Sequence, residues 1–193
     1  MKDIALITLH GGCFIGGNST WDKDQTQLFQ EIGFDVYQLE FDKTSLSVCL
    51  EDIRNQVKNI KQNYKKVIVL GRSSGGYMAK YLFEEKLFDK AIYLAPIFDP
   101  ILHGKIIPKL GKTQQPFFTN SKIIPNPLHN WDNNNELLLL ATQDENVPLE
   151  CFSEIQLQNA IFIGPKTHKG ITTCVSTKFV NIINNFNNNF NGN

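Results

Sequence analysis

The stretch Val67-Ile68-Val69-Leu70-Gly71-Arg72-Ser73-Ser74-Gly75-Gly76 decides the fold that the sequence predicts. Its four leading apolar residues predict a buried strand, and the glycines that follow predict a sharp turn into a helix. A serine at such a turn projects its hydroxyl beyond the strand, while the helix directs free N–H groups towards the same place. We therefore expect Ser73 to be a nucleophile.

Apolar runs like this one recur along the chain and alternate with helical patterns. Several of the runs are continuously apolar, which is typical of strands buried on both faces. Strands are expected at residues 4–9, 34–41, 66–71, 90–95, 136–142 and 160–164. Helical spacing of apolar residues lies between them, and Gly33 is expected to end the first helix. The alternation predicts an α/β fold: a three-layer α/β/α sandwich with a mostly parallel sheet of about six strands.

Residues 99–135 interrupt this alternation with a long connection that contains five prolines. Connections of this length within a compact domain are usually functional lids or disordered segments. We expect a small lid-like insertion over a pocket, and a plain surface insertion is the alternative. Residues 187–193 are rich in asparagine and are expected to form a frayed tail.

Composition places the chain among ordinary globular proteins. Its 193 residues are 41% apolar and 20% charged, which suits one soluble domain. The formal net charge is zero, which argues against nucleic acid as a partner. The first apolar run is too short for a signal peptide or a membrane span, so a cytoplasmic protein without a membrane partner is expected. The four cysteines are dispersed without CxxC spacing, which predicts buried thiols rather than disulfides or a zinc site.

The strand pattern also supplies the two partners that a serine nucleophile needs. A serine hydroxyl attacks well only when a base takes its proton and an acid orients that base. Asp144 follows the strand expected at 136–142, and His168, the only histidine downstream of Asp144, follows the strand expected at 160–164. Because functional groups of open parallel sheets gather at the carboxyl ends of strands, all three residues are expected on one edge.

A glycine-rich loop, His10-Gly11-Gly12-Cys13, follows the first strand. Acyl transfer needs N–H donors for an oxyanion, and glycines let the backbone approach it closely. We expect one donor to be the N–H of Ser74 and the opposing donor to be that of Gly12 or Cys13. If the strand order is 2-1-3-4-5-6, the first and third strands are neighbours, and this loop faces Ser73 across the crevice.

Two other acids compete for the role of Asp144. Asp99, which follows the fourth strand, is the main rival, and Glu145 is a weaker one. Either would have to lie beside His168 to orient its ring.

The remaining histidines and Cys13 have simpler interpretations. His10 is expected to hydrogen-bond the backbone of the glycine-rich loop. His103 and His129 lie in the insertion and are expected at the surface. Cys13 does not lie in a sharp strand-to-helix turn, or elbow, of the kind predicted around Ser73, which argues against a cysteine nucleophile.

Taken together, these motifs resemble the α/β-hydrolase superfamily. The glycine-rich loop is similar to that of hormone-sensitive-lipase-like carboxylesterases and arylformamidases. The resemblance covers residues 4–186 and implies one α/β-hydrolase domain over residues 1–193. It implies Ser73 as nucleophile, Asp144 as acid and His168 as base, with no metal ion and no organic cofactor.

The chain departs from the family pattern at three points. Cys13 replaces the third glycine of the usual loop, which keeps the N–H but adds a side chain near the acyl site. Arg72 and Ser74 occupy the variable positions of the elbow, where histidine and alanine are frequent. The chain begins at what would be the third strand of the family, so a minimal form is expected.

The expected function is hydrolysis of a small carboxylic ester by a serine esterase through an acyl-enzyme intermediate. Phe14, Phe117, Phe118 and Trp131 are expected to line an apolar acyl or aryl pocket, and core packing is the alternative. Hydrolysis of an amide, a formamide or a small peptide uses the same triad and is left open. The alternative outside the enzymes is a non-catalytic binding module of the same fold. Such proteins commonly lose a triad residue, whereas none is missing here.

Overall fold

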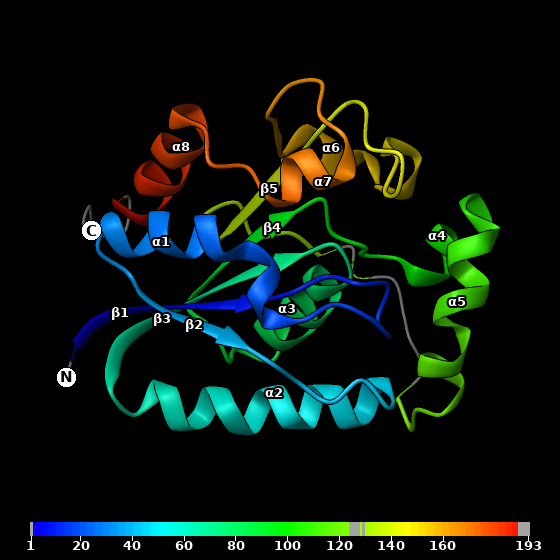
Figure 1. Ribbon diagram of the computed structural model, residues 1–193, viewed down its shortest axis with the longest axis horizontal. Coiled ribbons are helices and arrows are strands. Elements are labelled where there is room, and N and C mark those ends of the chain that lie inside the picture. The colour runs from blue at the N-terminus through cyan, green and yellow to red at the C-terminus, as the bar shows by residue number, and fades with distance from the viewer. Residues whose placement is uncertain (1, 124–127, 129, 189–193) are drawn as a thin grey trace.

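A six-stranded parallel sheet forms the centre of the protein (Figure 1). The computed structural model describes residues 2–123, 128 and 130–188. The strands lie in the order β2-β1-β3-β4-β5-β6, and every neighbouring pair is parallel. Their bounds are β1 Lys2–Leu9, β2 Asp35–Leu39, β3 Tyr64–Arg72, β4 Lys90–Leu94, β5 Glu136–Leu140 and β6 Ala160–Phe162. The predicted strands and the fold class are confirmed, and the strand order is the one under which the glycine-rich loop was expected to face Ser73.

Helices cover both faces of this sheet and form the two outer layers (Figure 1). The α-helices of the described residues are α1 Lys23–Glu31, α2 Leu46–Lys61, α3 Ser74–Glu84, α4 Pro100–Ile106, α5 Pro108–Thr119, α6 Glu154–Gln158, α7 His168–Thr172 and α8 Thr177–Asn188. Ile7 of β1 belongs to the core cluster that α2 and α3 cover, and Leu6 belongs to the cluster that α1 and α8 cover. Successive strand residues thus face opposite layers.

Short 3-10 turns precede two of these helices, at Ser19–Asp22 and Leu149–Cys151. Gly33 follows α1 with φ +98°, and the adjoining Phe34 N–H donates to the Phe29 carbonyl. This is the glycine-terminated helix end that the sequence predicts.

The first part of the insertion at residues 99–135 is helical rather than irregular. α4 and α5 begin at Pro100 and Pro108, where a missing N–H leaves no helical hydrogen bond unmade. The two helices approach so closely that a Cβ on Gly111 would lie 2.7 Å from the Gly104 Cα. Of the five prolines that indicated a loop, Pro100 and Pro108 begin helices, Pro116 lies inside α5, and Pro125 and Pro127 lie outside the described residues. The role of this hairpin as a lid stays a prediction.

The last helix, α8, extends further than the sequence suggested. Its apolar residues Ile182, Ile183 and Phe186 belong to the core cluster or pack against it, which anchors the final turns. Residues 187 and 188 are therefore helical rather than frayed, and 189–193 lie outside the described residues. No helix in the described part of the chain has the length and apolar character to cross a membrane.

Candidate active site

Ser73 occupies a strained turn between β3 and α3. Its backbone has φ +51° and ψ −122°, a conformation that an L residue rarely adopts. The Ser73 N–H donates to the Leu94 carbonyl over 3.0 Å, and the Ser73 carbonyl accepts from the N–H groups of Gly76 and Ile97 over 2.9 and 3.0 Å. These bonds, to α3 and to the residues at the end of β4 and just after it, hold the strained turn in place.

The glycines around Ser73 allow this turn to pack tightly. A Cβ on Gly71 would lie 2.6 Å from the Gly75 carbonyl oxygen. A Cβ on Gly75 would overlap the carbonyl oxygen of Leu9, at the end of β1. The start of α3 therefore lies directly against the strand that leads into the glycine-rich loop.

That glycine-rich loop meets Ser73, as the strand order predicted. A Cβ on Gly11 would lie 3.0 Å from the Ser73 Cβ. Gly12, Cys13 and Phe14 all have positive φ, at +122°, +52° and +72°. The N–H groups of Gly12 and Cys13 make no backbone hydrogen bond within the described residues. Ser74 is the first residue of α3, so its N–H has no acceptor within the helix.

The His10 side chain is hydrogen-bonded to the backbone of this loop. Its Nδ1 lies 2.8 Å from the Gly11 carbonyl oxygen, an acceptor, so Nδ1 carries the proton. The ring stacks on Phe41 with centroids 4.3 Å apart, and its burial lowers the pKa below the usual value. The expectation that His10 hydrogen-bonds the loop backbone is confirmed.

Asp144 and His168 pair directly. The His168 Nδ1 lies 2.8 Å from Oδ2 and 3.0 Å from Oδ1 of Asp144, whose side chain is 2% exposed. Asp144 Oδ1 also accepts from the N–H groups of Asn146 and Val147, over 2.9 and 2.7 Å. A carboxylate accepts hydrogen bonds only, so Nδ1 is the protonated nitrogen of His168 and Nε2 carries the lone pair.

The neighbouring acids have other partners. Glu145 Oε2 accepts from the backbone N–H of His168 over 3.0 Å, at the first residue of α7. Asp99 accepts from the N–H groups of Ile101 and Leu102 and begins α4, so it has the role of a helix cap. Of the three acids considered for the role, Asp144 is the one beside the His168 ring.

A further contact, absent from the sequence predictions, links the elbow to α7. The guanidinium of Arg72 donates to Gln25 Oε1 over 2.6 and 3.0 Å and to the Thr172 carbonyl over 3.2 Å. Gln25 in turn donates to the Cys174 carbonyl over 2.7 Å. Gln25 is a polar residue on an amphipathic helix, and nothing in the sequence distinguishes it from a surface glutamine.

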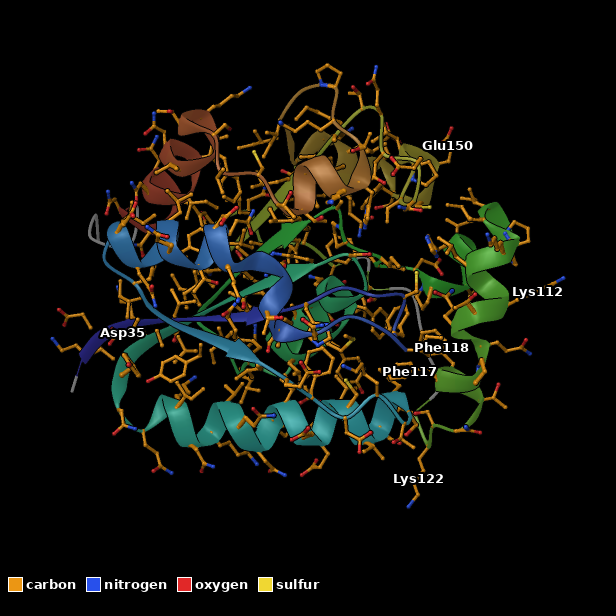
Figure 2. All side chains as sticks on the ribbon, in the orientation of Figure 1. Asp35, Lys112, Phe117, Phe118, Lys122 and Glu150 are labelled. Atoms are coloured by element: carbon orange, nitrogen blue, oxygen red, sulfur yellow. The ribbon has the colours of Figure 1, made fainter. Side chains whose placement is uncertain are left out.

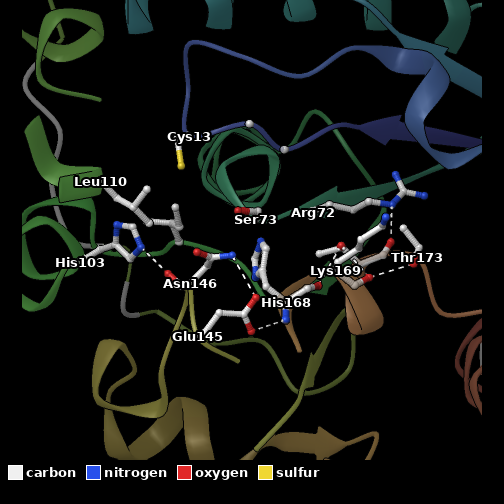
Figure 3. Close-up of a pocket in the computed structure, with 14 residues that line it drawn as sticks. Cys13, Arg72, Ser73, His103, Leu110, Glu145, Asn146, His168, Lys169 and Thr173 are labelled. Carbon is white, nitrogen blue, oxygen red and sulfur yellow. Dashed lines mark hydrogen bonds between the residues drawn. The ribbon is translucent and has the colours of Figure 1, made fainter. Parts of the chain in front are cut away.

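A cavity of about 540 Å³ brings these elements together. The ring of His168 is directed towards Ser73 in this cavity (Figure 3). Its walls consist of Gly11, Gly12, Cys13, Arg72, Ser73, Ile97, His103, Leu110, Glu145, Asn146, His168, Lys169, Thr172 and Thr173. Within the described residues Ser73 and His168 are not directly hydrogen-bonded. Catalytic bonds are often long before substrate binds.

The prediction that His103 lies at the surface is wrong. His103 is fully buried rather than exposed, and its Nε2 donates to the Asn146 carbonyl over 2.7 Å. Burial lowers the pKa of His103 below its usual value. The other predicted surface histidine, residue 129, lies outside the described residues.

The four aromatic residues expected in the acyl pocket lie elsewhere. Phe14 packs against Phe117 and Phe118, with centroids 5.3 and 4.8 Å apart, and none of these rings lines the cavity. Phe117 and Phe118 project from α5 towards the body of the protein (Figure 2). Trp131 packs near Tyr93, with centroids 6.1 Å apart. The large apolar area of these rings is buried in core contacts, the alternative that the sequence left open.

The four cysteines are free thiols, as predicted. Cys49, Cys151 and Cys174 are buried, whereas Cys13 is partly exposed at the cavity. Partial burial raises the pKa of Cys13, which disfavours the thiolate that a cysteine nucleophile needs.

Solved structures share this fold at low sequence identity. An esterase of Pyrococcus furiosus is 20% identical, with 96% of this chain and 81% of that chain covered and a TM-score of 0.70. Esterase B of Lactobacillus rhamnosis is 11% identical, with 98% and 78% covered and a TM-score of 0.71. A pyrethroid hydrolase of Sphingobium faniae is 16% identical, with 96% and 96% covered and a TM-score of 0.61. These similarities establish the α/β-hydrolase fold.

Sequence comparison gives the family. No curated protein matches the chain. The profile of the uncharacterised protein family UPF0227 matches residues 5–156, a segment that contains Ser73 and Asp144 and ends before His168. The finer resemblance to hormone-sensitive-lipase-like esterases and arylformamidases stays a prediction. With the matched segment covering most of its length, the chain belongs to the uncharacterised protein family UPF0227.

Proposed function

We propose that the protein is a serine hydrolase that cleaves a small carboxylic ester, with Ser73 as nucleophile, His168 as base and Asp144 as the acid that orients it. The observation that carries the proposal is the hydrogen bond from His168 Nδ1 to Asp144, beside a cavity that Ser73 also lines. This bond leaves the Nε2 lone pair free to accept the proton of the Ser73 hydroxyl.

The reaction proceeds in two halves. Ser73 Oγ attacks the ester carbonyl while His168 Nε2 takes its proton, and the tetrahedral oxyanion accepts hydrogen bonds from the N–H groups of Ser74 and of Gly12 or Cys13. His168 then gives its proton to the leaving alcohol. In the second half, water gives a proton to His168 and attacks the acyl-enzyme. His168 then returns this proton to Ser73 Oγ as the acyl–Oγ bond breaks, which releases the acid and restores Ser73.

Two further observations support this choice. The backbone strain at Ser73 is of the kind that holds an exposed nucleophile at a strand-to-helix turn. The fold is shared with proteins named as esterases and a pyrethroid hydrolase. Fold alone does not define an activity, so the side-chain geometry carries the argument.

Labelling with a fluorophosphonate probe tests the nucleophile. Wild-type protein is expected to form a covalent adduct, and Ser73→Ala is expected to lose it together with about 10⁴-fold or more of the hydrolysis of 4-nitrophenyl butyrate. Peptide mapping by mass spectrometry identifies the labelled residue. The adjacent Ser74→Ala variant separates the two serines, because labelling that survives in Ser73→Ala and is lost in Ser74→Ala would contradict the assignment.

A further inference from the structure

The side chains that line the cavity around Ser73 differ in polarity between its two ends. Leu110 and His103 lie on one side of Ser73 and His168, and Lys169 lies on the other side, with Arg72 (Figure 3). The first end therefore presents an apolar side chain and a buried neutral ring. The second end presents charged side chains, and an asymmetric substrate would fit such a cavity in one orientation.

Lys169 is the accessible cation of the second end. It lines the cavity, its side chain is exposed, and no ion pair or hydrogen bond occupies its ammonium group within the described part of the chain. Its backbone is fixed, because the Lys169 carbonyl accepts from both the N–H and the hydroxyl of Thr173, over 3.1 and 2.8 Å. A lysine in this position brings positive charge to the wall of the cavity that Ser73 and His168 also line.

The acids of the site do not cancel this charge by direct contact. Asp144 is bonded to the His168 ring, and Glu145 accepts from the His168 backbone N–H. Arg72 differs from Lys169, because its guanidinium is buried and engaged by Gln25 and the Thr172 carbonyl. Lys169 thus remains available to a ligand that enters the cavity.

We propose that the substrate carries an anionic group, such as a carboxylate, and that Lys169 binds it. This inference rests on the proposed ester hydrolysis. The anion selects the orientation in which the ester carbonyl reaches Ser73 and the uncharged part of the substrate lies towards Leu110. Because Lys169 follows the base directly in the chain, it acts as a specificity residue beside the reaction rather than as a catalytic residue.

Two pairs of synthetic esters test this inference. One pair is the butyryl ester of 4-hydroxybenzoate and its neutral twin, in which the carboxylate is methylated. The other pair is the 4-nitrophenyl monoester of adipic acid and its methylated twin. The first pair places the anion on the alcohol and the second places it on the acyl group. The readout is the ratio of kcat/KM for the anionic ester to that for its neutral twin, so intrinsic reactivity cancels between variants.

In at least one pair, Lys169→Gln is expected to lower this ratio by about two- to fivefold, as for an accessible ion pair, mainly through KM. Lys169→Glu is expected to lower it further, and 0.5 M NaCl is expected to lower it in the wild type but not in Lys169→Gln. Lys166→Gln, which removes a charge from the same loop away from the cavity wall, is the matched control.

The outcomes are distinguishable. An effect in the first pair or the second assigns the anion to the alcohol or to the acyl group. An unchanged ratio in both pairs, in variants that still label with the uncharged fluorophosphonate probe, overturns the inference and leaves the proposed hydrolysis standing. A protein that hydrolyses none of the four esters and shows no labelling of Ser73 contradicts the proposed function and the inference with it.

Discussion

His168 is held at two points. Asp144 binds its ring, and Glu145 accepts from its backbone N–H at the start of α7. Consecutive residues after β5 therefore fix both the tautomer of the imidazole and the position of the helix that carries it. Because a general base must keep its nitrogen within hydrogen-bond reach of the nucleophile, the second contact is as relevant to the proposed chemistry as the first.

Replacing Glu145 separates these two effects. Glu145→Ala removes the acceptor and is expected to lower kcat about threefold to tenfold, a larger effect than on KM, because His168 loses an anchor. Glu145→Gln retains an acceptor oxygen and is expected to recover much of the loss. Steady-state kinetics with 4-nitrophenyl butyrate measure both variants. Equal kcat in wild type, Glu145→Ala and Glu145→Gln would count against a positioning role.

Residues that share a motif and a strand end were predictable, whereas tertiary polar contacts were not. Ser73, Asp144 and His168 each follow an apolar run, and parallel strands bring such positions to one edge. Gln25 and His103 belong to no motif. Their burial depends on carbonyl groups supplied by distant loops, which no local pattern encodes.

The glycine-rich loop between β1 and the first 3-10 turn acts as a rigid element. Gly12 to Phe14 have positive φ in succession, and the N–H groups of Ile15 and Gly16 donate to the Gly12 carbonyl. Gly17, with φ +80°, closes the loop over Gly11 so tightly that a Cβ would overlap the Gly11 carbonyl oxygen. Positions of this kind cannot accept a side chain without a shift of the backbone.

A matched pair of alanine variants tests this rigidity. Gly33→Ala adds a methyl group at φ +98° in open space, so we expect only backbone strain of about 1 kcal/mol and a fall in Tm of roughly 2–4 °C. Gly17→Ala adds the same strain and also displaces Gly11, so its Tm is expected to fall further and its fluorophosphonate labelling to slow. Calorimetry and labelling rates measure both, and an equal fall in Tm with unchanged labelling would refute the rigid loop.

The strands were easier to predict than the helices of the insertion. Short apolar runs that alternate with helical patterns are typical of a parallel sheet, and the structure has a strand at each of the six expected places. Pro100 and Pro108 suggested a loop, because proline usually interrupts a helix. Both stand at the first residue of a helix, where proline is compatible with the helical backbone.

At the scale of the whole molecule, two buried histidines link stability to pH. Burial lowers the pKa of His10 and His103 below the ordinary 6.5. The folded protein therefore holds both rings neutral at pH values where the unfolded chain would protonate them. The stabilisation from burying the neutral rings is fully present above about pH 6.5 and is lost as the pH falls towards the lower pKa of the folded state.

The expected result is a lower Tm at pH 5.5 than at pH 8, because proton uptake by the unfolded chain favours unfolding over that interval. His103→Gln removes one of the two titrating groups and keeps an amide donor for the Asn146 carbonyl, so its Tm is expected to change less between the same two pH values. Differential scanning calorimetry in buffers of equal ionic strength measures both proteins. A pH dependence that is identical in the variant would contradict the contribution of His103.

The contact from Gln25 to the Cys174 carbonyl joins residues 149 positions apart in the chain. During synthesis, the segment that contains Cys174 leaves the ribosome long after β1, β3 and the elbow have emerged. The ribosome therefore releases the proposed nucleophile, Ser73, and the glycine-rich loop before it releases His168, the proposed base, and the Cys174 carbonyl that binds Gln25. The proposed site is therefore complete only after the segment around Cys174 has been synthesised, and a product truncated before His168 would lack the proposed base.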